Sequence, residues 1–294
     1  MKKLVLILLF NFLILNLFAQ IDSAKAIQNK RKIVFTSAGT FYVGLYTSLG
    51  VLWYSKEKTT PFHFFNDNKE WMQVDKMGHA LSAYALSDAG VKTMLTLKYP
   101  KQKAYLLGSL TGVIFQTPIE IFDGFMADYG ASVGDAVANV SGSAFCYTQY
   151  SLWDEIRIQP KFSFKQTNFR DISPRPNLLG SSWTDQWLKD YNGQTYWLSF
   201  NIIQLSNNKI PFPKWLNVAI GTGASNMLTS NFEENTALGY RPYRRYSLSL
   251  DVDFRAIPTK NPFLKKLFNA VNYLKVPFPT LQYSTKHGFE GTWY

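Results

Sequence analysis

The sequence predicts an α+β protein, in which an N-terminal bundle of about four helices, embedded in a membrane or not, precedes a smaller β-rich region. Two observations predict this order. Long apolar segments rich in small residues fill the first half, and short alternating segments bounded by Asn, Gly and Pro fill the second. A chain of 294 residues can hold two cores. We expect a signal peptide at 1–20, a helical domain at 21–155 and a β-rich region at 156–294.

The first twenty residues have the features of a secretory signal peptide. Lys2 and Lys3 precede an apolar run from Leu4 to Phe18, and Ala19-Gln20 follows as a small-residue cleavage zone. An uncleaved anchor helix is the alternative, although the run is short for a bilayer of about 30 Å. No cysteine stands at this junction, so we do not expect the lipid anchor of a lipoprotein. The sequence therefore predicts export to the cell envelope, at the inner or the outer membrane.

Four helices are expected in the first half, at 33–54, 74–97, 103–122 and 132–153. The first range contains 22 residues without a charge, which is long enough to span a bilayer. Small residues such as Gly108 and Gly112 let helix backbones approach one another closely. The pattern fits helices that span a membrane and also a bundle that lies against a membrane from the periplasmic side.

Strands are expected in the second half, at 196–203, 216–223, 246–254 and 280–294, with a short amphipathic helix at 262–274. From Tyr246 to Phe254 apolar residues occupy every second position. One face of this strand must be buried or face lipid, and the other must be wet. Four or five strands are too few for the smallest outer-membrane barrel, so the sequence favours a small sheet packed on the helices.

The composition limits the class of protein. Hydrophobic residues make up 46% of the chain and aromatic residues 16%, which excludes a disordered protein. A mean hydropathy of -0.13 is too low for a transporter built only from spanning helices. The net charge of +11 suits anionic lipid or an acidic partner, and export makes nucleic acid the least suitable partner. The single cysteine, Cys146, is expected to be a buried core thiol.

Seven polar residues on three of the predicted helices form the candidate site. They are Asp75, Lys76, His79, Glu120, Asp123, Asp135 and Asn139. Asp75 and His79 are four residues apart and share one helix face. Ser132, Asp135, Asn139 and Gly142 likewise lie along a single stripe of the last helix. Because unpaired charges are costly among small apolar residues, we expect these groups to meet.

The chemistry of this cluster has three interpretations. The acids and His79 could bind a divalent cation, or His79 could act as a general base that Asp75 orients. Alternatively, the cluster is a structural network in which Lys76 neutralises an acid and Asn139 satisfies backbone groups. The sequence specifies no cofactor and leaves open whether a metal binds. It contains no Gly-rich phosphate loop, Cys-pair metal motif or nucleophile elbow.

The order of these residues resembles a known family. Asp75-Lys76-x-x-His79, then Glu120, then Asp135-x-x-x-Asn139 resembles the YfiM-like periplasmic family, often labelled predicted periplasmic lipoproteins, and is more distantly similar to VanZ-like membrane proteins. The resemblance covers residues 70–145 and implies a small membrane-associated helical domain with this shared polar set. The VanZ-like resemblance also implies glycopeptide tolerance. Asp123 stands where the pattern has Gln, and the Arg expected before the final Asp is missing.

Other polar residues carry weaker patterns. His63 lies in an aromatic segment and is expected to be an interfacial packing residue, and His287 is expected at the surface. Arg241, Arg244 and Arg245 alternate with tyrosines in a basic-aromatic loop. This loop is either a solvated turn or a contact for phospholipid or lipopolysaccharide phosphates.

From the sequence we hypothesise a cell-envelope protein whose Asp/Glu/His cluster binds or processes a lipid-linked or cell-wall molecule. A membrane lipid or a cell-wall precursor would be its partner. The alternative is a non-enzymatic envelope scaffold, or a lipid- or partner-binding protein, with a purely structural polar network. The sequence does not decide whether the protein is an enzyme.

Overall fold

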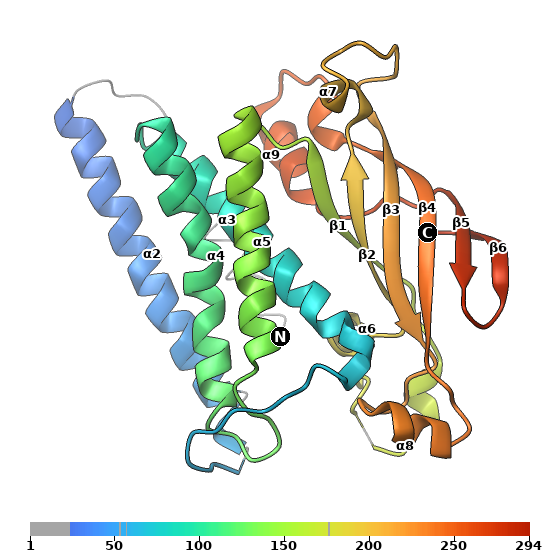
Figure 1. Cartoon of the computed structure of the whole chain (residues 1–294). Helices are drawn as coiled ribbons and strands as arrows, with labels where there is room; N and C mark the ends of the chain where they lie inside the picture. The colour runs from blue at the N-terminus through green and yellow to red at the C-terminus, as the bar shows by residue number, and fades with distance from the viewer. Residues whose placement is uncertain (1–23, 53, 57, 176) are drawn as a thin grey trace.

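The computed structural model describes residues 24–52, 54–56, 58–175 and 177–294. The expected signal peptide at 1–20 lies outside these residues. Within them, helices come first and an antiparallel sheet follows, so the α+β class is confirmed (Figure 1). The domain boundaries at 21–155 and 156–294 stay a prediction.

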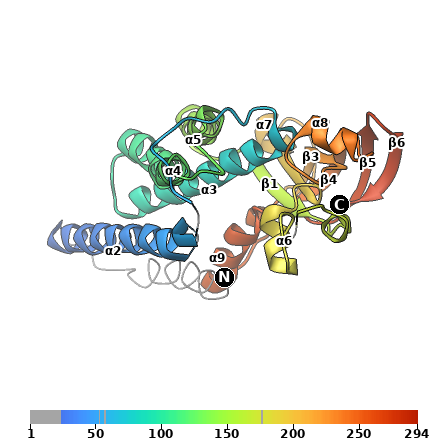
Figure 2. The same ribbon diagram turned by 90° about the horizontal axis from the view of Figure 1, so that it is seen from below.

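Four long helices form the first half: α2 (Ala24–Leu52), α3 (Val74–Thr96), α4 (Lys101–Asp123) and α5 (Val133–Trp153). The last three match the expected ranges closely. The first begins at Ala24 instead of Ile33, so the basic residues before Ile33 belong to the helix. Seen from below, α3 runs from the other helices toward the sheet and connects the two parts (Figure 2).

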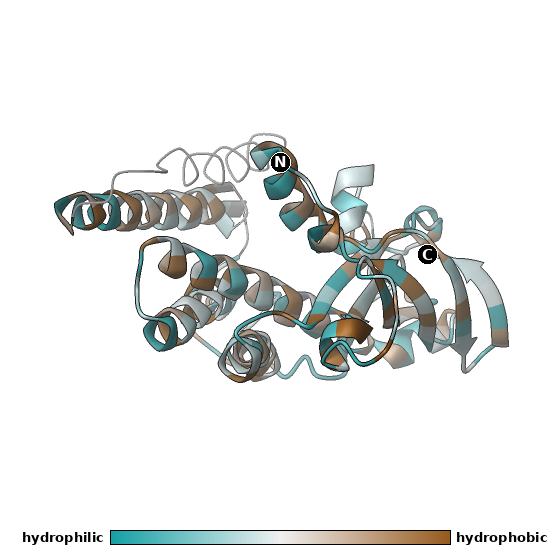
Figure 3. Ribbon diagram, turned by 90° about the horizontal axis from the view of Figure 1, so that it is seen from above, coloured by the Kyte–Doolittle hydropathy of each residue, from teal (hydrophilic) through white to brown (hydrophobic). Residues whose placement is uncertain are grey.

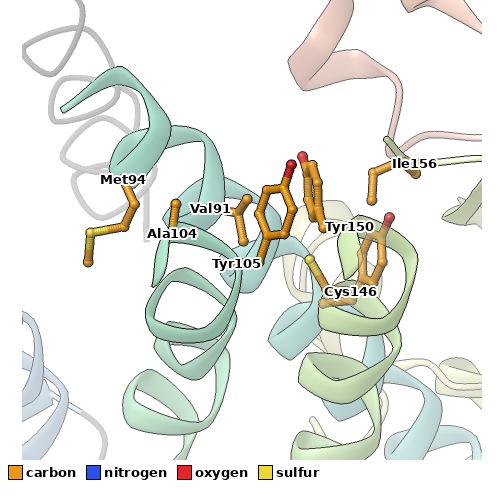
Figure 4. Packing of buried hydrophobic residues seen from close by; sticks show 8 residues of the cluster. Val91, Met94, Ala104, Tyr105, Cys146, Tyr150 and Ile156 are labelled. Atoms are coloured by element: carbon orange, nitrogen blue, oxygen red, sulfur yellow. The ribbon is translucent and has the colours of Figure 1, made fainter. Parts of the chain in front are cut away.

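Close backbone contacts hold α3, α4 and α5 together. A Cβ atom on Gly112 would overlap the backbone of Ala83, and one on Gly142 would overlap the backbone of Ala80. Larger side chains fill the space beyond these crossings, where the rings of Tyr105 and Tyr150 stack with centroids 5.2 Å apart (Figure 4). Cys146 is fully buried in the same cluster, as expected for a core thiol (Figure 4).

The second half is a six-stranded antiparallel sheet in which each strand pairs with the next along the chain. The strands are β1 (Ile158–Phe164), β2 (Gln194–Phe200), β3 (Leu216–Ser225), β4 (Tyr243–Val252), β5 (Pro279–Ser284) and β6 (Gly288–Trp293). The connections contain the short helices α6 (Trp183–Lys189), α7 (Ile202–Leu205), α8 (Phe232–Ala237) and α9 (Pro262–Val271).

Two strands differ from the expectation. β1 was not predicted because it contains Pro160, which cannot donate a hydrogen bond to a neighbouring strand. Its position at the edge of the sheet makes this proline tolerable. The expected strand at 280–294 is instead the hairpin of β5 and β6. The chain reverses just before Gly288, whose φ of 73° suits glycine.

The sheet buries its polar face. In β4, Leu248 and Leu250 are 49% and 40% exposed, whereas Ser249 and Asp251 are 5% and 0% exposed. The alternation expected for this strand is present, and Figure 3 shows hydrophilic and hydrophobic residues alternating along the strands. On the buried face Asp251 pairs with Lys161 at 2.7 Å. The apolar face is therefore the one left open.

Among the described residues, α4 is the one helix whose length and hydropathy would allow it to cross a membrane. A core helix of a soluble protein can have the same length and composition. The helix expected at 33–54 does not meet this test as α2, because Gly, Ser, Thr and Tyr residues lower the hydropathy of its uncharged part.

Candidate functional site

Lys76, in the first turn of α3, is the centre of one group of acids. Its Nζ atom lies 2.8 Å from Asp67 Oδ1, 3.2 Å from Asp75 Oδ2 and 2.9 Å from Asp135 Oδ1. These acids come from the segment before α3, from α3 itself and from α5. Although burial alone would lower it, hydrogen bonds to Asp67 and Asp135 raise the pKa of Lys76 well above its usual value. The ammonium group thus already occupies the space between three carboxylates.

A second group lies beside it and contains His79 from α3, Glu120 from α4 and Asp135 from α5. His79 Nδ1 is 3.6 Å from Glu120 Oε1, and His79 Nε2 is 3.9 Å from Asp135 Oδ2. One potential ligand atom from each residue lies within 4.8 Å of the other two. Asn139 Oδ1 is 3.3 Å from His79 Nδ1 on the same side of α5. The stripe predicted on this helix therefore does face α3.

Ser132 holds two carboxylates of the site, those of Asp67 and Glu120, and caps the helix that carries Asp135. As the N-cap of α5, its Oγ accepts from the backbone N–H of Asp135 at 3.0 Å and donates to Asp67 Oδ1 at 2.6 Å. Its own backbone N–H donates to Glu120 Oε2 at 3.2 Å. Asp135 Oδ1 is held by Lys76. The second oxygen of Glu120 and of Asp135 is left facing His79.

Negative charge is in excess at this site, and the acids respond to it. Burial, followed by the charge of Asp135, raises the pKa of Glu120 to about 8. Burial raises the pKa of Asp75 to about 6, although Lys76 opposes the shift, and burial raises the pKa of Asp135 as well. Burial would also raise the pKa of Asp67, but hydrogen bonds from Lys76 and Ser132 lower it.

Two carboxylate oxygens of the site residues, Asp75 Oδ1 and Glu120 Oε1, are buried without a hydrogen-bond partner among the described residues, and Glu120 Oε1 is the one beside His79. Among the described residues, Glu120 Oε1 has no hydrogen-bond partner, and Glu120 as a whole is 8% exposed. The His79 side chain next to it is 23% exposed. A cation that enters from solvent could therefore reach both the imidazole and the unpaired oxygen. A bound cation would also relieve the repulsion between the acids.

The structure brings together most of the predicted site residues, with two changes of role. Asp75 contacts Lys76. The side chains that contact His79 are those of Glu120, Asp135 and Asn139. The expected pairing of Asp75 with His79 is therefore not the arrangement seen.

Asp123 lies at the margin of the site. Its Oδ1 accepts a 2.6 Å hydrogen bond from the hydroxyl of Tyr54. Burial raises the pKa of Asp123 to about 6, and the Tyr54 hydrogen bond opposes that shift. Asp123 is absent from both three-residue groups whose ligand atoms converge.

Two contributors were not found from the sequence. Asp67 stands in an Asn-Asp-Asn run, which is typical of a turn, so its pattern gave no indication of a site. Tyr54 ends an apolar segment and reaches Asp123 only through the tertiary fold. Neither has a fixed spacing to the motif residues, and helix periodicity could not identify them.

The prediction of a basic-aromatic loop from Arg241 to Tyr246 is wrong for two of its arginines. Arg244 and Arg245 lie in strand β4. Arg245 is 8% exposed and donates to the carbonyl oxygens of Asn192 at 2.7 Å and Ala224 at 3.1 Å. Arg244 donates to the carbonyl oxygen of Met72. Arg245 is thereby buried on main-chain carbonyls, whereas Arg244 also donates to the side chain of Gln73 and stays partly exposed, so a contact with phosphates stays a prediction. Arg241 remains exposed before the strand.

The two remaining histidines lie apart from the site. His63 Nε2 is 3.0 Å from the carbonyl oxygen of Tyr129, so the ring joins two loops, in agreement with a packing role. His287 is exposed in the turn between β5 and β6, as expected for a surface residue.

Comparison with known proteins identifies one family. Residues 63–151 match a family described as a predicted periplasmic lipoprotein (DUF2279). No curated protein and no solved structure matches the chain. The matched range contains α3, α4, all of α5 except its last two residues, and all seven residues of the predicted site. Over this helical part, the chain is similar to a family of predicted periplasmic lipoproteins, which supports a location in the cell envelope.

Proposed function

We propose that His79, Glu120 and Asp135 bind a divalent cation in a membrane-associated envelope protein. The cation would hold an anionic group, such as a phosphate, of a lipid-linked or cell-wall molecule. The observation that carries this proposal is the pair of carboxylate oxygens, Glu120 Oε1 and Asp135 Oδ2, that face one imidazole ring. Glu120 Oε1 is buried and lacks a partner among the described residues.

The potential ligands favour the group of His79, Glu120 and Asp135 over the group of acids around Lys76 as the cation site. Both groups bring three ligand atoms within 4.8 Å, but Lys76 already occupies the group of Asp67, Asp75 and Asp135. One imidazole and two carboxylates are a suitable set for Zn²⁺, whose three-ligand sites leave a position open for a substrate or water. Because the site is rich in acids, a phosphate would be repelled unless a cation lay between them.

Aromatic residues at the same end of the bundle support a membrane-associated substrate. Phe62, Phe64 and Phe125 are 43%, 70% and 43% exposed, and their rings pack with Phe62 between the other two at 5.4 and 5.3 Å. Phe64 pairs with Ala131, the residue before Ser132. Exposed phenylalanine side chains that gather in one patch are typical of protein surfaces that contact a membrane. The VanZ-like resemblance agrees with this proposal.

Zinc titration calorimetry on the purified protein tests the cation site. Asp135→Asn and His79→Gln each remove one ligand and should weaken Zn²⁺ binding by at least about tenfold. Asp123→Asn is the matched control, because it removes a buried carboxylate from α4 that Tyr54 holds outside the site. Equal Zn²⁺ affinity in the unmodified protein and in Asp135→Asn would contradict the proposal.

A structural scaffold is the second candidate function, and the contacts of Lys76 favour it. Its ammonium joins Asp67 and Asp135, which belong to segments 68 positions apart in the sequence (135 − 67). A pure scaffold should bind no Zn²⁺ and should lose stability when Lys76 is replaced. Titration calorimetry with Zn²⁺ therefore separates the two candidate functions, since only the cation-binding protein should release or absorb heat of Zn²⁺ binding.

A further inference from the structure

An apolar cleft of about 710 Å³ lies between the helices and the sheet. On α3 it is lined by Met77, Leu81 and Tyr84, which lie on a different face of the helix from Lys76 and His79. Its volume falls within the range of about 300–1,000 Å³ that is usual for ligand pockets. None of the three proposed cation ligands lines it.

The sheet supplies one wall of this cleft with its open apolar face. Ile220, Leu248, Leu281 and Phe289, on four successive strands, are 48%, 49%, 50% and 73% exposed. The intervening polar residues of β4 are buried on the opposite face of the sheet. Monomeric soluble proteins rarely expose a contiguous apolar surface unless something binds there. A hydrophobic occupant would cover these side chains.

The opposite wall and the charge of the lining limit what that occupant can be. Met77, Leu81 and Phe145 face the sheet from α3 and α5. Of the described residues that line the cleft, one is charged, Lys161, and its side chain is 0% exposed and paired with Asp251. The lining therefore offers no free charge to a ligand. The part of the ligand that enters must be uncharged and apolar.

We propose that this cleft holds one acyl chain of a membrane phospholipid, with the head group left at the surface. An α-helix is ~10 Å wide and rises ~5.4 Å per turn, so a volume of 710 Å³ would hold fewer than two turns of a partner helix. A hydrocarbon chain is thinner and can lie between the two walls. The net charge of +11 also favours an anionic head group.

The first test measures chain-length dependence. Parinaric acid, a fluorescent long-chain fatty acid, serves as the probe, and single-chain phosphatidylglycerols of increasing length displace it. Each pair of added methylenes should tighten binding by about fifteenfold until the cleft is full. Affinity that is independent of chain length would overturn the proposal. Displacement by free fatty acids but not by the single-chain phosphatidylglycerols would overturn the phospholipid assignment.

A matched pair of variants in β4 locates the binding site. Leu248 lines the cleft, whereas Leu250 has similar exposure on the same face of the strand and does not line it. Leu248→Lys should weaken binding by at least tenfold, and Leu250→Lys should leave it unchanged. Equal losses would show that the whole apolar face lies against a bilayer or a protein, and would overturn the proposal. If Leu248→Lys fails to fold, Leu281→Lys on β5 makes the same comparison with Leu250→Lys.

The cation site provides an independent control. Asp135→Asn lies outside the cleft and should bind single-chain phosphatidylglycerol as the unmodified protein does. Loss of Zn²⁺ binding with normal lipid binding would separate the two sites. In Leu248→Lys we expect the opposite, which is weakened lipid binding with normal Zn²⁺ binding. Together the two variants would show that the cation site and the cleft are separate sites.

Discussion

Charged groups are buried in two regions of this molecule, and the balance of charge differs between them. In the sheet, Lys161 and Asp251 are both 0% exposed and form an ion pair at 2.7 Å, and the buried ammonium of Lys275 also interacts with Asp251. At the helical site, carboxylates outnumber the basic groups Lys76 and His79, and the imidazole is partly open to solvent. Burial of charge alone therefore does not indicate function. An excess of one sign beside an accessible ligand atom is the feature that indicates a binding site.

The largest effect should come from the paired region. Lys161→Met removes the direct ion-pair partner of buried Asp251 and leaves Lys275 as the nearby cation, so the free energy of unfolding should fall by up to about 3–5 kcal/mol. Urea unfolding followed by circular dichroism measures this loss. The double variant Lys161→Met/Asp251→Leu removes both charges and should recover much of the stability. A single variant as stable as the unmodified protein would mean that this pair does not stabilise the fold.

A smaller loss is expected at the helical site. Lys76→Met removes the cation between three carboxylates, but these acids can take up protons because the pKa of Asp75 is already about 6. We expect a loss of about 1–3 kcal/mol at pH 8 and a clearly smaller loss at pH 5. Urea unfolding at the two pH values measures both. A loss as large as that of Lys161→Met, at either pH, would remove the distinction between the regions.

The stability of the protein without metal should depend on pH through Glu120. Its pKa is about 8 in the folded protein against an ordinary value of 4.5, so between these values the folded state binds more protons than the unfolded state. The contribution of Glu120 to the free energy of unfolding is therefore greatest below pH 4.5. This contribution is lost as the pH rises through 8. The slope should not exceed about 1.4 kcal/mol per pH unit.

Glu120→Gln and Zn²⁺ provide the controls for this slope. Glu120→Gln has no titrating group at this position, so its unfolding free energy should fall less between pH 5 and 8. Because a metal binds the deprotonated carboxylate, saturating Zn²⁺ should raise the melting temperature more at pH 8 than at pH 6. A variant with the same pH slope as the unmodified protein would assign the titration to other acids.

Sequence reasoning reached the helical site more closely than the sheet, for a physical reason. Helix periodicity fixes which side chains share a face, so the sequence predicts Asp135 and Asn139 on one stripe, and in the structure both lie beside His79. In β4, apolar and polar residues alternate, which assigns them to two faces of the sheet. The alternation does not indicate which face is buried, and in this protein the polar face is buried. Asp67 joins the site through a loop, where no periodicity applies.

The smallest effect should come from Asp123, which tests where the helical site ends. Asp123→Asn weakens one hydrogen bond from Tyr54 and should lower stability by about 1 kcal/mol. Because the charge of Asp123 contributes to the raised pKa of Glu120, its removal should also shift the titration of Glu120 to slightly lower pH. Zn²⁺ affinity at pH 8 should stay unchanged within about twofold, as measured by calorimetry. A tenfold loss would extend the metal site to Asp123, because residues that support the ligands from outside can change metal affinity by that amount.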